Sequence, residues 1–125
     1  MRLAAGRRED LPRVLFAQGG YYLGTGVLPF ISRGLFETAT GPKREWWLVQ
    51  TVSGLVLVIG GALVAAALRR NTSTEIVAVA SGTAATLAAI DVVYVAKRRI
   101  APTYLIDAGA EIGILAALAE SCARR

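Results

Sequence analysis

Long apolar runs separated by short polar segments dominate this chain. Four such runs lie at about 12–36, 46–68, 75–96 and 103–121. About 20 apolar residues in a helix are enough to cross the roughly 30 Å hydrocarbon core of a bilayer. The pattern therefore predicts an all-α membrane protein, a four-transmembrane-helix bundle with short loops. Residues 1–125 would form a single domain, because no loop is long enough to hold another.

Local signals indicate where these helices begin, end and bend. Gly41 suits the end of one helix and Pro42 the first position of the next. Thr72 and Glu75 have the spacing of a capping box, with Thr72 as the N-cap of the third span. Pro29 lacks a backbone donor, so we expect a kink in the first span.

Small residues four apart predict close contacts between helices, because they let backbones approach each other in lipid. We expect such contacts at Gly20 with Gly24, at Gly61 with Ala65, and at Gly109 with Gly113.

Composition supports a membrane protein and argues against several other classes. The chain is 54% hydrophobic and 18% charged, whereas soluble domains have about 25% charged residues. Its net charge of +5 fits flanks that meet anionic lipid headgroups. Because no basic patch is interleaved with aromatic residues, we expect no nucleic-acid partner.

The chain has no histidine and one cysteine. Imidazole acid–base catalysis, the usual zinc sites and an intrachain disulfide are thereby excluded. We therefore expect no metal site and no cofactor.

Basic residues outside the spans predict the orientation. With four spans both termini share one side, together with the second loop. That side holds Arg2, Arg7, Arg8, Arg13, Arg69, Arg70, Arg124 and Arg125, against Lys43, Arg44, Lys97, Arg98 and Arg99 on the other. The positive-inside rule then puts both termini in the cytoplasm. The small margin leaves dual insertion open, and residues 1–13 are expected to be an irregular basic flank.

Ionisable residues also lie within or beside the predicted spans, and they mark a candidate polar pocket. The first and third loops share one end of the bundle, and this set lies toward that end: Arg33, Glu37, Asp91, Asp107 and Glu111. A carboxylate inside a span is costly and marks a function by default. Tyr94 and Tyr104 are expected beside this pocket, with Trp46 and Trp47 as anchors at the membrane interface.

The charges of this set do not balance. If all are ionised, one cation faces four carboxylates, which calls for protonation, a bound cation or basic loop residues. Glu111 is expected near mid-bilayer, where burial and nearby Asp107 favour its protonated form. Arg33 and Asp91 have similar expected depths, which predicts an ion pair between the first and third spans. Alternatively, Arg33 and Glu37, one turn apart, form a local pair.

The run Phe36-Glu-Thr-Ala-Thr-Gly-Pro-Lys-Arg-Glu-Trp-Trp47, followed later by Asp91-Val-Val-Tyr94 and Tyr104-Leu-Ile-Asp107, resembles small four-span bacterial membrane proteins that are uncharacterised. The resemblance covers most of the chain. It implies the bacterial inner membrane as location and implies no activity.

Three functions remain open from the sequence. The preferred hypothesis is a polar, acidic pocket that binds or transports a proton, a cation or a polar lipid headgroup, in a protomer that forms a homodimer. The second is a structural or accessory subunit whose buried charges pair with a partner. The third is a lipid-active enzyme with carboxylate acid–base catalysis, and an enzymatic role is the least favoured.

Overall fold

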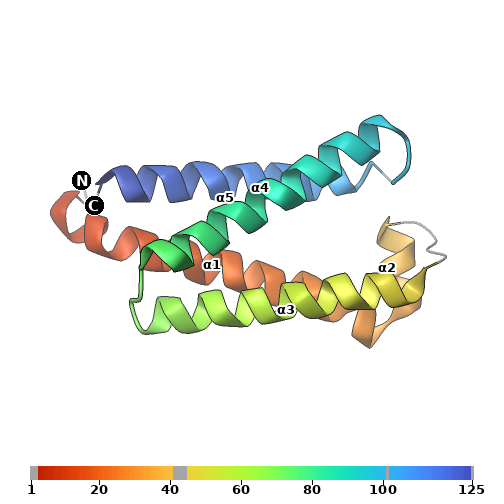
Figure 1. Ribbon diagram of the computed structural model, residues 1–125, viewed down its shortest axis with the longest axis horizontal. Helices are drawn as coiled ribbons and strands as arrows, with labels where there is room; N and C mark the ends of the chain where they lie inside the picture. Colours follow the sequence, from red (N-terminus) through yellow and green to blue (C-terminus); the bar gives the residue numbers. More distant parts are fainter. Residues whose placement is uncertain (1–2, 41–44, 101, 125) are drawn as a thin grey trace.

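The computed structural model describes residues 3–40, 45–100 and 102–124, and these residues form helices and turns with no strand. Five helices follow one another: α1 (Leu3–Ile31), α2 (Arg33–Thr40), α3 (Trp46–Leu68), α4 (Thr74–Ala96) and α5 (Tyr104–Arg124). The four long helices alternate in direction, and both ends of the chain lie at the same end of the bundle (Figure 1). The connection between α3 and α4 is at that end too. The α4–α5 connection, which corresponds to the predicted third loop, and α2 lie at the opposite end. Residues 41–44 of the predicted first loop fall outside the described residues.

Among the described residues, three segments are long and apolar enough to cross a membrane, namely Asp10–Ile31, Trp46–Leu68 and Thr74–Ala96. They agree with the prediction of a multi-pass membrane protein. The fourth predicted span corresponds to α5, which has 21 residues and a length of about 31 Å. Its acidic residues set it apart from the other three, and its passage through the bilayer stays a prediction.

The predicted bounds agree closely with α3, α4 and α5, and one predicted cap is wrong. Ser73, rather than Thr72, is the N-cap of α4, because its Oγ accepts a hydrogen bond from the backbone N–H of Ile76. Glu75 remains in the first turn, where the helix dipole favours an acidic side chain. The predicted roles of Gly41 and Pro42 fall outside the described residues.

The first predicted span is two helices, not one. Helix α1 begins at Leu3, so the expected irregular flank is wrong for residues 3–13, and residues 1–2 fall outside the described residues. It ends at Ile31, two residues after Pro29, whose missing N–H weakens the last turn. Ser32 then interrupts the helix, and its Oγ accepts the N–H of Leu35 at 3.0 Å as α2 begins. Residues 33–36 therefore belong to a separate short helix that departs from the direction of α1 (Figure 1).

Helices α1 and α3 pack through glycines that the small-residue pattern did not predict. A Cβ on Gly19 would lie 2.7 Å from the Gly60 carbonyl oxygen, and one on Gly60 would lie 2.8 Å from that of Gly19. Seven residues along, Gly26 approaches the backbone of Ser53 in the same way. This heptad spacing is typical of two antiparallel helices that keep one face in contact.

The glycines of the predicted small-residue pairs, on α1, α3 and α5, do not lie against neighbouring helices. An added Cβ would meet nothing within 4 Å at Gly20, Gly24, Gly61, Gly109 or Gly113. Whether a glycine meets a neighbouring helix depends on how its own helix is rotated about its axis. The spacing of small residues does not determine that rotation.

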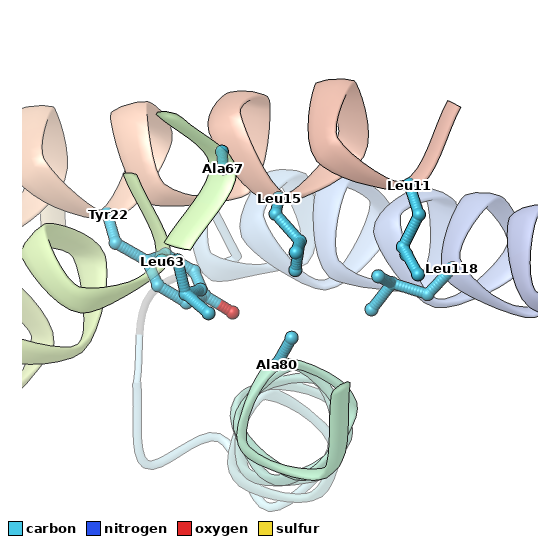
Figure 2. Close-up of a cluster of buried hydrophobic side chains, with 7 residues drawn as sticks. All are labelled: Leu11, Leu15, Tyr22, Leu63, Ala67, Ala80 and Leu118. Carbon is cyan, nitrogen blue, oxygen red and sulfur yellow. The ribbon is translucent and has the colours of Figure 1, made fainter. Parts of the chain in front are cut away.

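The apolar core lies at the end of the bundle that holds the chain termini. Its seven buried side chains come from all four long helices and point toward the space between them (Figure 2): Leu11, Leu15, Tyr22, Leu63, Ala67, Ala80 and Leu118. Tyr22 is at the inner edge of this core. Beyond it, toward α2, polar side chains and a pocket take the place of close apolar packing.

Candidate functional site

Three carboxyl groups from α4 and α5 lie together, nearer the α4–α5 connection than the end of the bundle that holds the chain termini. The Asp107 side chain is within hydrogen-bonding reach of both Asp91 and Glu111. Asp91 is 5% exposed and Glu111 is fully buried. Asp107 and Glu111 are one turn apart and therefore share a face of α5. Helix α4 packs beside α5 and brings Asp91 next to Asp107 on that face.

Helix α1 supplies hydroxyl donors to two of these carboxyl groups. The Tyr21 hydroxyl donates to Oδ1 of Asp107 at 2.5 Å, and the Tyr22 hydroxyl donates to Oε1 of Glu111 at 2.7 Å. Gln18 Nε2 donates to the Tyr22 hydroxyl at 3.0 Å and to the carbonyl oxygen of Ala80 at 2.9 Å. A directed chain of hydrogen bonds thus runs from Gln18 through Tyr22 to Glu111.

Three buried acceptor atoms of this cluster have no hydrogen-bond partner among the described residues: Gln18 Oε1, Asp91 Oδ2 and Glu111 Oε2. A buried polar atom left without a partner costs about 1–3 kcal/mol, and more when it is charged. Native structures contain few such atoms, and they call for a cause such as an ion, a proton or a water. All three atoms are acceptors, so a hydrogen-bond donor or a cation would satisfy them, and the two carboxyl oxygens could also bind a proton.

The acidic cluster borders a pocket of about 680 Å³. Helix α1 contributes Tyr21, Tyr22, Thr25, Gly26 and Leu28, and α2 contributes Phe36, Thr38 and Thr40. Helix α3 contributes Leu48, Val49, Val52, Ser53 and Val56, and the remaining residues are Leu87, Thr103, Tyr104, Ile106, Asp107 and Glu111. The walls are thus largely apolar and aromatic, with the two acidic groups of α5 on one side.

The structure separates Arg33 and Glu37 from the acidic cluster. Both lie on α2, where Arg33 Nε is 3.4 Å from Glu37 Oε2, so the local pair one turn apart is present. The Arg33 guanidinium also lies over the Trp46 ring, 4.7 Å from its centroid. Neither residue lines the pocket. The contacts described for Asp91 are with Asp107 rather than with Arg33.

The aromatic residues predicted at this end have different positions. Tyr104 lines the pocket and hydrogen-bonds with the side chain of Thr40, which links α5 to α2. Tyr94 lies outside the pocket lining, with Lys97 Nζ 5.4 Å from its ring centroid. Trp46 packs edge-on against Phe36, and Trp47 is 62% exposed. Their role as membrane anchors stays a prediction.

Sequence reasoning missed Gln18, Tyr21 and Tyr22, which are central to the site. A signal was present, because Gln18 and Tyr22 are four residues apart in an apolar span and so share one helix face. Polar side chains at such a depth are a reason to suspect function. The glycines of the same span drew the interpretation toward helix packing instead.

Electrostatics limit what the cluster can hold. Two like charges 4 Å apart repel by about 4 kcal/mol at an effective dielectric constant of 20. Three neighbouring carboxyl groups are therefore expected to retain at least one proton, or to share a positive ligand. Over the described residues, no three His, Cys, Asp or Glu side chains are arranged to hold a metal ion. The arrangement is better suited to a proton or to a cation held by charge alone.

No protein-family model matches the chain, and neither curated proteins nor solved structures give a significant match.

Proposed function

We propose that this chain is a small bacterial inner-membrane protein whose buried carboxyl cluster takes up and releases a proton in exchange for a bound cation. The observation that carries this proposal is Glu111. It is fully buried, one carboxyl oxygen accepts from Tyr22, and the other has no hydrogen-bond partner among the residues that the structure describes. Nearby Asp107 disfavours a second negative charge, so a proton or a cation stabilises the site.

The hydrogen-bond chain supports proton binding at a defined atom. Tyr22 already receives a bond from Gln18 and uses its own hydrogen toward Oε1 of Glu111. The free oxygen, Oε2, is therefore the atom available for a proton. Asp107 lies between Glu111 and Asp91, and a proton released from Glu111 has neighbouring acceptors in both. Three adjacent carboxyl groups that can pass a proton from one to the next are suited to proton transport or to proton sensing.

Infrared difference spectroscopy of purified protein in nanodiscs tests the proposal. A pH step should change the carbonyl stretch of a protonated carboxyl group, and Glu111→Gln should remove that change. Glu120→Gln is the matched control, because Glu120 lies on the same helix and is exposed. If Glu111 titrated like a glutamate in water, the proposal would be wrong.

The proposed location and orientation rest on the pattern of the chain. In the described part of the chain three helices are apolar enough to span a bilayer. Helix α5 packs beside two of them, α1 and α4, and its acidic face is toward them. A fourth crossing by α5 would leave both ends of the chain on one side. The excess of arginine on that side supports a cytoplasmic position for both termini.

A structural role is the second candidate, and the two tyrosine bonds favour it. Tyr21 and Tyr22 connect α1 to α5 through Asp107 and Glu111. In this case the carboxyl groups would fix how the two halves of the bundle pack, and no proton would be exchanged. Glu111→Gln would then lower stability, while the wild-type infrared spectrum would show no pH-dependent change at this residue.

A further inference from the structure

The pocket beside the carboxyl cluster has the size and surface of a site for a small organic molecule. Ligand pockets of about 300–1,000 Å³ with mostly apolar walls and a few polar groups are typical of such sites. This pocket measures about 680 Å³, and Tyr21, Tyr22, Phe36 and Tyr104 are among the residues that line it. Aromatic faces attract cations as well as apolar groups.

The formal charges of its walls have one sign. Asp107 and Glu111 are acidic, and none of the described residues that line the pocket is Lys or Arg. Glu111 is fully buried, and within the described part of the chain one of its carboxyl oxygens has no hydrogen-bond partner. The groups around Glu111 are Asp107 on its own helix, Asp91 on α4, and Gln18 and Tyr22 on α1. None of these four carries a positive charge.

The pocket also borders the outer, apolar surface of the bundle. Three apolar residues that line it are exposed, with Leu48 at 44%, Val52 at 52% and Ile106 at 74%. They come from α3 and α5, whose exposed apolar side chains would face the hydrocarbon of a bilayer. A ligand that enters here crosses an apolar opening before it reaches the acidic wall.

These observations lead to one class of ligand. We propose that the pocket binds an organic cation with an apolar body, its positive group against Asp107 and Glu111 and its body against α3 and Phe36. This proposal rests on the proposed function and names the cation that would exchange with the proton. The bound cation would compensate the negative charge of Asp107 and Glu111. When the pocket is empty, a proton would take that role.

The same chemistry, an ammonium group on an apolar body, also occurs in phosphatidylethanolamine. A lipid of that type carries a phosphate next to its ammonium group. The described lining offers no basic side chain to pair with that phosphate, and an unpaired charge away from water is costly. The pocket therefore favours a cation without an attached anionic group.

Tetraphenylphosphonium and tetraphenylborate are the probes that test this inference. They have nearly the same shape and apolar surface and carry opposite charges. Binding is measured by equilibrium dialysis against purified protein in a neutral detergent, with protein-free micelles subtracted. We expect tetraphenylphosphonium to bind at least about tenfold more tightly than tetraphenylborate. Equal binding of both ions, as an acyl-chain groove would give, or binding of neither, would overturn the inference.

Variants locate the bound cation and separate the two proposals. Glu111→Gln should weaken tetraphenylphosphonium binding by about tenfold or more, because the partner charge is lost. Val52→Trp should weaken it similarly by filling the pocket, and should leave the infrared signal of Glu111 unchanged. Val58→Trp is the control on the same helix, because Val58 is 70% exposed and does not line the pocket. Equal losses in both tryptophan variants would overturn the assignment to this pocket.

The lipid arm and the infrared arm complete the test. Protein in nanodiscs of phosphatidylethanolamine and of phosphatidylcholine should bind tetraphenylphosphonium with the same affinity. Weaker binding of tetraphenylphosphonium in phosphatidylethanolamine than in phosphatidylcholine would mean that a lipid headgroup occupies the pocket. That result would overturn the proposal of an organic cation. A pH-dependent Glu111 signal without selective cation binding would refute this inference and leave the proton site standing. Selective binding without that signal would refute the proton exchange.

Discussion

The Tyr22 hydroxyl donates a 2.7 Å hydrogen bond to Glu111 across 89 residues of sequence, and both side chains are buried. This bond joins α1 to α5 where the apolar core gives way to the pocket. It also fixes which oxygen of Glu111 is satisfied. The remaining oxygen is the feature on which the proposed proton site depends.

Tyr22→Phe should lower the free energy of unfolding by about 1–3 kcal/mol, because a buried carboxyl group loses its donor. Unfolding in mixed micelles measures this loss. Tyr21→Phe is the matched comparison, since Tyr21 makes the corresponding bond to Asp107 but is only half-buried. We expect the smaller loss there, because water can reach that position. Equal losses would mean that burial does not distinguish the two bonds.

Gly19→Ala should destabilise the protein by about 1–3 kcal/mol, since the new methyl group would overlap the backbone of α3. The predicted overlap is with the Gly60 carbonyl oxygen, 2.7 Å from the added Cβ. Gly20→Ala, one residue along, meets nothing within 4 Å and should be neutral or stabilise the protein by up to about 1 kcal/mol, because alanine favours the helix. Thermal denaturation of both variants measures the difference. A neutral Gly19→Ala would contradict the close approach of α1 and α3.

A double-mutant cycle of Arg33→Ala and Asp91→Asn should give additive losses of stability, to within about 0.5 kcal/mol. Arg33 pairs with Glu37 on α2, and its side chain is 53% exposed, whereas Asp91 is buried beside Asp107. The cycle of Arg33→Ala with Glu37→Gln should show coupling of about 0.3–0.5 kcal/mol, as for other exposed pairs one turn apart. Strong coupling between Arg33 and Asp91 would restore the ion pair that the sequence predicts.

Reporter fusions test the four crossings. Fusions before α1, at Asn71 and after α5 should all report the same side, because the start of α1, the α3–α4 connection and the end of α5 lie at one end of the bundle (Figure 1). The excess of arginine at that end predicts that this side is the cytoplasm. A fusion after α5 that reported the periplasm would contradict its passage through the bilayer. Equal signals on both sides would indicate dual insertion instead.

Sequence patterning was most successful for elements that are determined locally. The apolar run of α3 predicts Trp46–Leu68, which are its bounds in the structure, because one continuous apolar stretch between charged segments defines a span. The carboxyl groups of Asp107 and Glu111 were expected on one face from their spacing alone. The first span was less well predicted, because Pro29 and Ser32 divide it into two helices and its hydropathy did not indicate this break.

What the sequence by itself determined is the class of structure, the number and order of the long helices, and the acidic residues that cannot all be charged in an apolar interior. The tertiary structure decided which faces meet. The close contact between α1 and α3 is at Gly19 and Gly60, and not at the spaced pairs Gly20–Gly24 and Gly61–Ala65. Tyr22, rather than Arg33, lies beside the buried acids. The physical reason is that helix periodicity fixes which residues share a face, whereas the rotation of each helix against its neighbours is set by packing of the whole bundle.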